Sequence, residues 1–426
     1  MVDCGLFQGL KDLRIKNWRS LPLTPQTIDT VLLTHAHIDH SGYLPLLVKN
    51  GFKGQVLTTG GTKALCKILL PDAGHLQEED AAFANRHEFS KHHPALPLYT
   101  EEDAIASLNF LQDIPWKEKI SLAKNASCSF SPAGHIIGAS IIQIENNGRK
   151  ITFSGDLGRS KDLTMKPPSS IQETDYLVVE STYGDRCHPT EDPLNSLKEI
   201  INRTMTRGGI LLIPAFAVGR AQQMLYLISE LKKRKQIDDI PVYLNSPMAI
   251  QATQVSCNFS DETILSEAQC RSLCDVARFV TTMDESRTLN ALGSPAIIIS
   301  ASGMATGGRV LHHLKFLASN PQNTILFVGF QAAGTRGEAL TRGNDHIKIH
   351  GIEIPVHAEV VLLETLSAHA DANELMAWLK GFRKAPKMTF ITHGEPPAAA
   401  AFKKHIEEQL GWHCTIPNYL DRFELT

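Results

Sequence analysis

The residues best suited to chemistry form one short segment, His35-Ala36-His37-Ile38-Asp39-His40, directly after the apolar run Thr30 to Leu33. Imidazole and carboxylate groups are good ligands for Zn²⁺, and the H-x-H alternation lets two rings converge on one ion. Asp39 and His40 then point elsewhere, where they can serve a second ion. A solvated histidine cluster is the weaker alternative, because packing alone does not explain so many ligands at the end of a buried strand. The spacing predicts a binuclear metal site.

Two further candidates follow later strand-like runs. His135 stands in Pro132-Ala133-Gly134-His135, where small residues let the backbone approach closely, and Asp156 stands in Phe153-Ser154-Gly155-Asp156. A carboxylate at Asp156 can bridge two ions about 3.5 to 4 Å apart, as in two-metal hydrolases. We therefore expect both side chains to meet the segment 35–40 in the folded protein.

Alternating strand and helix segments must position these groups. Apolar runs at 30–33, 54–59 and 127–131, with a helical stretch from Thr62, indicate an α/β fold. The runs 140–145 and 150–154 flank Asn146-Asn147-Gly148, whose Asn-Gly step suits a tight antiparallel hairpin. Antiparallel pairs followed by helices favour two sheets packed face to face with helices outside.

From about residue 186 the pattern changes to apolar, β-branched runs separated by helices. Runs at 210–214, 242–245, 296–301 and 324–330, with a helix over 219–235, are typical of a mostly parallel sheet in a second, Rossmann-like domain. After a run at 360–363 we expect a helix over 371–382, a strand over 388–392 and a helix over 396–410. The predicted division is 1–185 and 367–426 for one domain and 186–366 for an insertion within it.

The order of the metal-binding motifs resembles that of the metallo-β-lactamase superfamily, with Asp3 in Val2-Asp3-Cys4-Gly5 ahead of the segment 35–40. The resemblance implies an αββα sandwich with metals at the sheet edge and an inserted Rossmann-like domain. It also implies that Asp3 orients a ligand imidazole by accepting its other N–H. Members usually carry about two more strands before this motif, so an exposed sheet edge is expected.

Three later motifs resemble those of the β-CASP nucleases in that superfamily. The stretch from Tyr176 to Gly184, which contains Glu180, is similar to motif A, Ser367-Ala368-His369-Ala370-Asp371 to motif B and Thr392-His393-Gly394-Glu395 to motif C. Each motif alone could be a helix cap or a packed histidine, but their order around an insertion favours function. A histidine in motif C is typical of the RNA-acting members, which include the endonuclease of pre-mRNA 3′-end cleavage and its prokaryotic homologues.

The resemblance implies a zinc-dependent ribonuclease in which a bridging hydroxide attacks phosphorus and leaves a 5′-phosphate and a 3′-hydroxyl. His369 would protonate the leaving oxygen, with Glu180 fixing its tautomer. The implied assignments are one zinc on His35, His37 and His135, a second on Asp39, His40 and His393, Asp156 bridging both, and a catalytic set of His369, Glu180 and Asp39.

Phosphate-binding residues are expected in the insertion. Arg220, the pair Ser302-Gly303 and Arg309 lie at helix starts or in a glycine-rich turn, where guanidinium and backbone N–H groups can bind RNA phosphates. Simple tight turns are the alternative interpretation. Neither a P-loop nor a dinucleotide fingerprint occurs in this stretch.

The composition excludes several classes of protein. With 426 residues, 42% of them hydrophobic and 20% charged, the chain is globular rather than disordered. A formal net charge of −3 provides no global basic field, so RNA must be held by a local patch. No apolar run approaches the ~20 residues that a membrane span needs, and the N-terminus is unlike a secretory signal. The 8 cysteines, scattered without a C-x-x-C pair, indicate reduced thiols and a cytoplasmic location.

Two other functions stay open on the sequence. A small-molecule metallohydrolase of thioesterase or lactamase type would share the metal site, although the long insertion argues against it. A catalytically silent RNA-binding scaffold would have lost ligands, and here every ligand is present. The short stretch after motif C favours a compact endonuclease over the longer ribonuclease J type. Additional 5′ exonucleolytic action and a homodimer are expectations from the resemblance alone.

Overall fold

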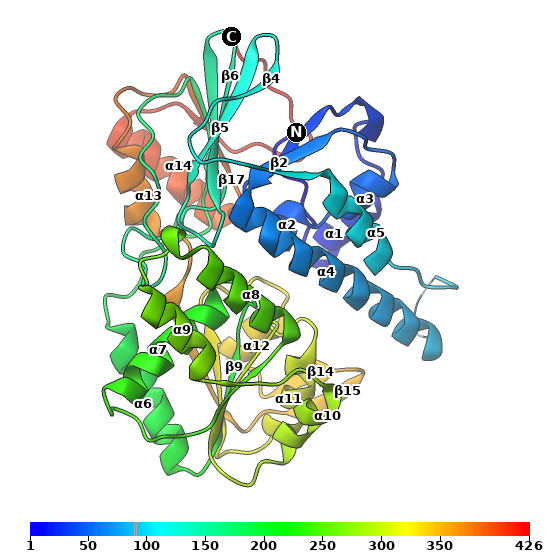
Figure 1. The fold of residues 1–426 in the computed structure, drawn as a ribbon, viewed down its shortest axis with the longest axis vertical. Helices are drawn as coiled ribbons and strands as arrows, with labels where there is room; N and C mark the ends of the chain where they lie inside the picture. Colours follow the sequence, from blue (N-terminus) through cyan, green and yellow to red (C-terminus); the bar gives the residue numbers. More distant parts are fainter. Residues whose placement is uncertain (89, 91) are drawn as a thin grey trace. The chain divides into compact units, whose positions relative to one another are not determined.

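The computed structural model describes residues 1–88, 90 and 92–426, which divide into two compact units (Figure 1). Unit 1 comprises Met1–Gln8, Arg14–Cys187 and His369–Thr426, and unit 2 comprises Gly9–Leu13 and His188–Ala368. The domain limits at 185/186 and 366/367 remain a prediction, since the units are defined by contacts alone.

The first sheet of unit 1 has three parallel strands in the order β1-β2-β3. Its strands and the neighbouring helices are β1 (Thr30–Leu32), α2 (Ile38–Ser41), α3 (Leu44–Lys49), β2 (Gln55–Thr59), α4 (Gly60–Arg86), α5 (Glu101–Ser107) and β3 (Leu111–Ile114). The segment 1–3 lies alongside β1, because the Leu32 N–H donates to the Met1 carbonyl over 2.8 Å and the Asp3 N–H donates to the Leu32 carbonyl over 2.9 Å. Asp3 is thereby held beside the strand that leads to His35.

The second sheet of unit 1 has seven strands in the order β18-β17-β8-β7-β6-β5-β4. Its strands and their helices are β4 (Ile120–Ala123), β5 (Ala126–Pro132), β6 (Ser140–Asn146), β7 (Arg149–Phe153), β8 (Tyr176–Glu180), α13 (Ala372–Leu379), β17 (Met388–Thr392), α14 (Pro396–Leu410) and β18 (Cys414–Thr415). The predicted hairpin is confirmed: β6 pairs antiparallel with β7, and Asn147 and Gly148 take φ angles of 51° and 78° at the turn. The strands β7, β8, β17 and β18 pair in parallel.

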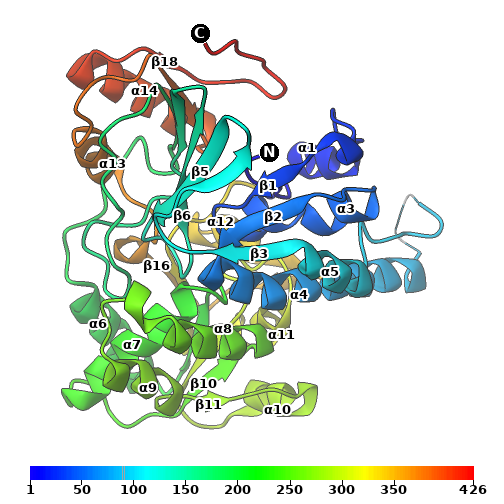
Figure 2. The ribbon, with the colours of Figure 1, turned by 45° about the horizontal axis from the view of Figure 1, so that its top comes forward.

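The two sheets of unit 1 pack face to face. Their common core contains Leu32 and Leu57 from the first sheet and Cys128, Phe130 and Ile142 from the second. Figure 2 shows α4 and α14 on opposite outer sides of this pair of sheets. The predicted αββα sandwich is therefore confirmed, and it follows from the alternation of inward apolar residues along the strands.

Unit 2 is built on a six-stranded sheet in the order β11-β10-β12-β9-β13-β16, with every pairing parallel. Its main strands read as continuous apolar runs, as in Ala296–Ser300, because helices cover parallel sheets on both faces. The elements are α6 (Pro193–Thr206), β9 (Ile210–Pro214), α7 (Arg220–Lys233), β10 (Val242–Asn245), α8 (Pro247–Asn258), α9 (Glu267–Asp275), β11 (Arg278–Phe279), α10 (Met283–Thr288), β12 (Ala296–Ser300), α11 (Arg309–Leu317), β13 (Thr324–Val328), α12 (Arg336–Thr341), β14 (His346–Ile349), β15 (Ile352–Pro355) and β16 (Glu359–Leu363). The predicted Rossmann-like architecture is confirmed.

Short elements complete the chain. They are the helix α1 (Lys11–Arg14) and the 3-10 turns Ile15–Trp18, Pro25–Thr27, Leu108–Phe110, Ser260–Glu262, Leu289–Ala291 and Glu364–Leu366. Across residues 1–88, 90 and 92–426, no helix combines the length and apolar content needed to cross a membrane.

Candidate metal centre

The chemically active side chains of unit 1 lie where its strands end. His35 follows β1, Asp156 follows β7, Glu180 is the last residue of β8 and His393 directly follows β17. Because β7, β8 and β17 run parallel, their carboxyl ends share one edge of the sheet. His135 reaches the same place from the loop after β5, the strand that lies antiparallel to β6. The topology thus gathers residues that are distant in sequence.

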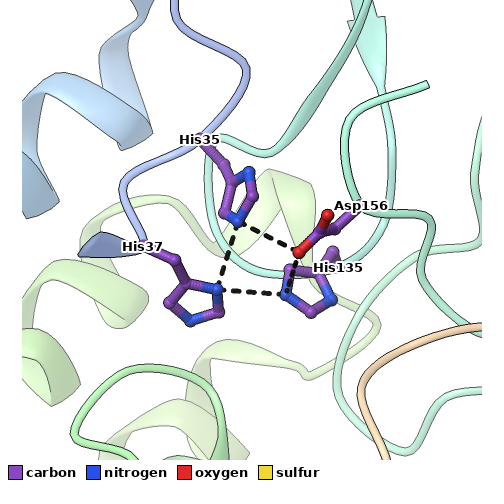
Figure 3. Close-up of side chains that lie close together, drawn as sticks. All are labelled: His35, His37, His135 and Asp156. Carbon is purple, nitrogen blue, oxygen red and sulfur yellow. Dashed lines mark hydrogen bonds and ion pairs between the residues drawn. The ribbon is translucent and has the colours of Figure 1, made fainter. Parts of the chain in front are cut away.

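The first group of candidate metal ligands, called the deep group, consists of His35, His37, His135 and Asp156 (Figure 3). The Nδ1 atom of His37 lies 3.1 Å from Nε2 of His35 and 3.2 Å from Nε2 of His135. Asp156 Oδ2 lies 3.4 Å from His35 Nε2 and 3.6 Å from His135 Nε2. The side chains of His35, His135 and Asp156 are at most 2% exposed, so the deep group is almost wholly shielded from solvent.

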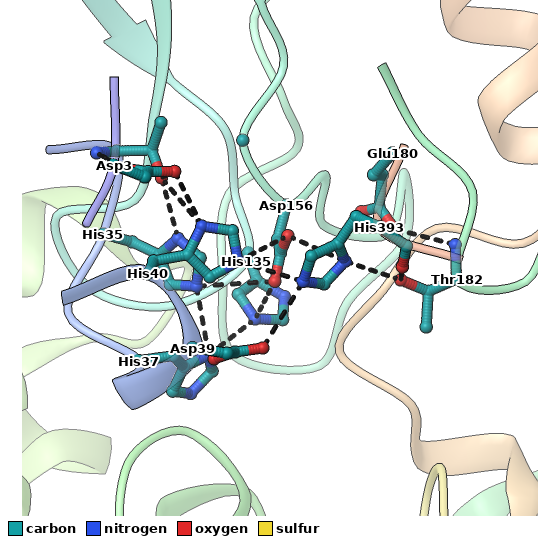
Figure 4. A network of polar contacts seen from close by, with 12 residues as sticks. Asp3, His35, His37, Asp39, His40, His135, Asp156, Glu180, Thr182 and His393 are labelled. Carbon is teal, nitrogen blue, oxygen red and sulfur yellow. Dashed lines mark hydrogen bonds and ion pairs between the residues drawn. The ribbon is translucent and has the colours of Figure 1, made fainter. Parts of the chain in front are cut away.

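The second group, called the outer group, consists of Asp39, His40 and His393 (Figure 4). His393 Nε2 lies 3.0 Å from His40 Nε2 and 3.4 Å from Asp39 Oδ2. The side chains of Asp39 and His393 are 40% and 29% exposed. Asp39 and His393 are therefore open to water, whereas His40 is buried like His35 and His135 of the deep group.

Asp156 joins the two groups. Its Oδ2 faces the deep imidazoles, whereas its Oδ1 lies 3.3 Å from His40 Nε2 and 3.4 Å from His393 Nδ1. Close packing of backbones sets this position: a Cβ on Gly158 would come within 1.9 Å of the Gly134 carbonyl oxygen. Only glycine allows the loop that carries Asp156 to approach the loop that carries His135 so closely.

Asp3 supports the segment 35–40 through two neighbours. Its Oδ1 accepts the Thr34 N–H over 2.7 Å, and its Oδ2 accepts the Thr34 hydroxyl over 2.9 Å and lies 2.7 Å from His40 Nδ1. A carboxylate on Nδ1 holds that nitrogen as the protonated one, which leaves Nε2 of His40 available on the side of His393. The expected partner of Asp3 is thus His40.

His369 and Glu180 form a pair beside the two groups. Nδ1 of His369 lies 3.2 Å from both carboxylate oxygens of Glu180, and its Nε2 lies 3.9 Å from Asp156 Oδ2. An antiparallel bridge between His369 and Gly158 fixes the backbone next to the loop of Asp156. Glu180 is 1% exposed, so its carboxylate is buried against the ring that it orients.

One polar neighbour of the centre was missed by the sequence analysis. The Thr182 hydroxyl oxygen lies 3.1 Å from Nδ1 of His393, and the two residues are 211 positions apart. The only hint in the sequence is that Thr182 stands two places after Glu180 in the same motif.

The deep imidazoles are held neutral. Burial, reinforced by neighbouring imidazoles, lowers the pKa of His35 and of His135, and it lowers the pKa of His37 to about 3. A neutral imidazole keeps the lone pair that a metal ion needs.

The outer imidazoles have the opposite shift. Burial alone would lower the pKa of His40, but Asp156 and Asp3 outweigh it and raise the pKa well above the usual value. Burial is likewise outweighed at His393, where Asp156 and Asp39 raise the pKa to about 9. In His369 the Glu180 carboxylate and Asp156 overcome burial and raise the pKa.

The donor set fits metal ions on two counts. His35 Nε2 and His135 Nε2 each lie within 3.2 Å of His37 Nδ1, so three imidazole nitrogens of the deep group converge as they would around a cation. Asp156 Oδ1 is buried and makes no hydrogen bond among the residues that the structure describes, although His40 Nε2 and His393 Nδ1 lie within ion-pair distance of it. A bound cation would give this buried oxygen a direct ligand bond.

The four phosphate-binding candidates lie in unit 2, and they differ in what already holds them. Arg220 begins α7 and donates to Gln223 Oε1, and its side chain is buried. Ser302 Oγ lies 3.0 Å from the Thr306 hydroxyl, and Gly303 packs against Phe216, whose backbone N would lie 2.8 Å from an added Cβ.

Arg309 is held by its own unit. Its guanidinium donates to Asn245 Oδ1 over 2.9 Å, to the Val280 carbonyl over 3.0 Å and to the Thr281 carbonyl over 2.7 Å. These bonds join α11 to the ends of β10 and β11. They account for the presence of Arg309 without a phosphate.

Three family models match the chain. The metallo-beta-lactamase superfamily matches residues 1–107, the Beta-Casp domain matches 221–340, and the Zn-dependent metallo-hydrolase RNA specificity domain matches 353–417. Together with the ligand groups at the sheet edge, these matches define the class of the protein as a metal-dependent hydrolase.

Relatives that match over nearly the whole of this chain identify the family within this class of hydrolases. The chain is 34% identical to Ribonuclease TTHA0252 of Thermus thermophilus over 95% of this chain and 89% of that protein. It is 30% identical to an RNase J-like protein of Methanocaldococcus jannaschii, covering 98% and 92% of the two chains. It is 32% identical to Transcription termination factor FttA of Thermococcus kodakarensis over 93% of this chain, which spans 62% of that protein. The chain belongs to the β-CASP ribonuclease family of the metallo-β-lactamase superfamily.

Proposed function

We propose that this protein is a two-zinc ribonuclease that hydrolyses phosphodiester bonds within RNA chains and leaves a 5′-phosphate and a 3′-hydroxyl. The observation that carries the proposal is the sharing of Asp156 by the deep and outer groups, with the His369–Glu180 pair beside it. A carboxylate with one oxygen toward each group suits a pair of divalent ions. The likeness to Ribonuclease TTHA0252 supports RNA as the substrate.

The residues divide into two ligand sets. His35, His37 and His135 would hold one ion, Asp39, His40 and His393 the other, and Asp156 both. When bound, such ions acidify water to a pKa near ~7 and withdraw charge from phosphate oxygens. Asp3 and Glu180 would not bind the ions themselves. Asp3 orients the imidazole of His40, and Glu180 orients that of His369.

His369 is the proposed general acid. The Glu180 carboxylate and Asp156 outweigh burial and raise the pKa of His369, which favours the protonated ring, and Glu180 holds the Nδ1 proton so that Nε2 faces the reaction centre. Protonation of the 3′ oxygen by this Nε2–H lets that oxygen leave as a hydroxyl.

Contacts to RNA are proposed for unit 2. The Ser302-Gly303 turn can offer backbone N–H groups to phosphates, and Arg220 at the start of α7, which is buried and donates to Gln223, would use its other guanidinium N–H groups. Arg309 is not retained in this set, because its donors bind Asn245 and two backbone carbonyls. We further propose a cytoplasmic location, supported by cysteines that are all unpaired, and assembly as a homodimer.

A cleavage assay tests the proposal. Purified protein is loaded with zinc and offered single-stranded RNA, single-stranded DNA and a chromogenic lactam, each with and without chelator, and the RNA ends are mapped. We expect internal RNA cuts that chelator abolishes. The variant His369→Ala should lose roughly 10²- to 10⁴-fold in rate, the range for a general acid, while keeping its metal.

Other outcomes reject parts of the proposal. Lactam hydrolysis without RNA cleavage would identify a small-molecule hydrolase, and RNA binding without cleavage would identify a scaffold. Loss of metal in His369→Ala would show that His369 is a ligand and not the acid. RNA cleavage that persists without any metal would contradict the metal centre altogether.

A further inference from the structure

The side chain of Thr182 is placed to control the chemistry of His393. Thr182 lies in the turn after β8, is 8% exposed and belongs to the same unit as the metal centre. Its Oγ1 lies 3.1 Å from His393 Nδ1 and 3.3 Å from the His393 carbonyl oxygen. Two contacts to one residue from a single hydroxyl fix that residue more tightly than either would alone.

If both contacts are hydrogen bonds and the His393 ring is neutral, the protons can be arranged in only one way. This arrangement leaves Nε2 of His393 able to bind a metal ion. A carbonyl oxygen can only accept, so the hydroxyl proton of Thr182 goes to the His393 carbonyl. The hydroxyl oxygen is then free to accept, and the Nδ1–H of the ring donates to it over 3.1 Å, closer than the Asp156 Oδ1 atom that lies 3.4 Å from the same nitrogen. The ring is held as the tautomer whose Nε2 carries a lone pair, and this atom faces His40 and Asp39 at 3.0 and 3.4 Å.

The backbone around His393 makes this support necessary. His393 has a φ of 61°, a conformation that residues with a side chain rarely adopt. A Cβ on the following Gly394 would lie 2.5 Å from the Ser181 carbonyl oxygen, and the Ser181 hydroxyl donates to the Thr392 carbonyl over 2.8 Å. The turn after β8 therefore contacts the chain on both sides of His393, through a hydrogen bond to Thr392 and a close backbone approach to Gly394.

We infer that Thr182 is a positioning residue that presents His393 Nε2 to the outer metal ion. The inference rests on the proposed metal centre. The end of β8 and the turn after it serve two imidazoles of the centre, since Glu180 orients His369 and Thr182 orients His393. Loss of the Thr182 hydroxyl should lower outer-ion affinity by about 10- to 100-fold, the usual effect of removing the group that orients a ligand. The deep ion should be unaffected.

Metal titration separates this role from a structural one. We would measure Zn²⁺ affinity and stoichiometry by competition with a chromophoric chelator in the wild type, Thr182→Val, Thr182→Ser and Thr389→Val. Thr389→Val replaces a threonine by valine on β17, away from the candidate ligands, and so controls for the general effect of this substitution on the sheet. We expect Thr182→Val to keep one tight ion and bind the second about 10- to 100-fold more weakly. Thr182→Ser and Thr389→Val should bind as the wild type does.

Several results overturn the inference. Two tight ions in Thr182→Val, or equal weakening in Thr182→Ser and Thr182→Val, would show that the hydroxyl does not position His393. Should Thr182→Val fail to fold, ¹⁵N-histidine spectra of the zinc-loaded wild type decide the matter, assigned with His393→Gln. They should show a proton on Nδ1 of His393, and a proton on Nε2 would refute the inference. A wild type that binds no zinc would instead refute the proposed metal centre.

Discussion

The deep and outer groups contain the same kinds of side chain but are prepared for metal in opposite ways. The deep imidazoles of His35 and His135 are buried and that of His37 is half-buried, and all three are held neutral, with the pKa of His37 lowered to about 3. The outer imidazoles face carboxylates that raise their pKa values, to about 9 in His393, and their neighbour Asp39 is 40% exposed. The deep imidazoles can therefore bind a metal ion without losing a proton, whereas the outer imidazoles must release protons before they bind one.

This difference indicates a division of roles. On the proposed two-ion centre, an ion in the deep group would be shielded and held by neutral ligands, and an ion in the outer group would be the more accessible of the two. Asp156 is the exception that ties the groups, since burial of this carboxylate is offset by the imidazoles around it, which lower its pKa. Substitutions in either group, or a change of pH, should therefore affect the two groups differently.

Asp156→Asn should have the largest effect, because it removes the shared charge from both groups. An amide cannot supply a negative oxygen to each side, so both affinities should fall. We expect RNA cleavage to fall by more than the roughly 100-fold that loss of a supporting hydrogen bond causes. Metal analysis and a cleavage assay measure both effects, and a variant that keeps two ions would refute the bridging role.

His135→Ala and His393→Ala should separate the groups. His393→Ala is expected to retain one ion of about wild-type affinity, whereas His135→Ala should weaken the deep ion and, through Asp156, the outer one as well. Rates of zinc loss to excess chelator provide the measurement, with two phases expected in the wild type and only the slow phase in His393→Ala. Equal behaviour of the two variants would abolish the distinction.

Acidity should affect the outer ion more than the deep one. Because the pKa of His393 is about 9 and that of His40 is also raised, both rings carry protons near pH ~7 that the ion must displace. Outer-ion affinity should therefore rise as pH increases toward about 9. Calorimetry in two buffers of different ionisation enthalpy should detect protons released mainly with the second ion.

The same shifts set the pH dependence of the metal-free protein. A pKa raised above the unfolded value of about 6.5 stabilises the fold fully below that pH, and the contribution is lost as the pH rises through about 9. Denaturant unfolding of metal-free protein across this range should show declining stability. Stability that increases with pH would contradict the assigned shifts.

Asp3→Asn should have the smallest effect. The amide keeps the size of the side chain and can still bind the Thr34 N–H, but it no longer places a charge 2.7 Å from His40 Nδ1. We expect outer-ion affinity to fall by about 10-fold, the low end for such supporting groups. A fall as large as that in Asp156→Asn would mean that Asp3 is itself a ligand.

Local patterns in the sequence were enough for much of the fold. The Asn-Gly step specified the β6–β7 turn by its own backbone chemistry, and the helix Pro396–Leu410 was predicted over the same residues. Short strands such as β4 and the β14–β15 hairpin were missed, because four-residue runs with mixed exposure carry little periodicity.

The centre was predictable as a set of residues but not as a geometry. Clustered histidines and motif order pointed to the ligands, whereas the partner of Asp3 and the role of Thr182 depend on how strands pair. Thr182 reaches His393 only because β8 and β17 align Glu180 with Thr392. The hydrogen bonds of Arg309 could not be predicted either, because Asn245 at the end of β10 and Val280 just after β11 are distant from it in the sequence.

The position of β17 has a consequence for the order in which the protein is made. This strand lies between β8 and β18 in the sheet, yet it follows residues 188–368 of unit 2 in the sequence. A nascent chain that ends before residue 369 has neither His369 nor His393. The centre therefore cannot be complete until the ribosome has synthesised all of unit 2 and the strand that follows it.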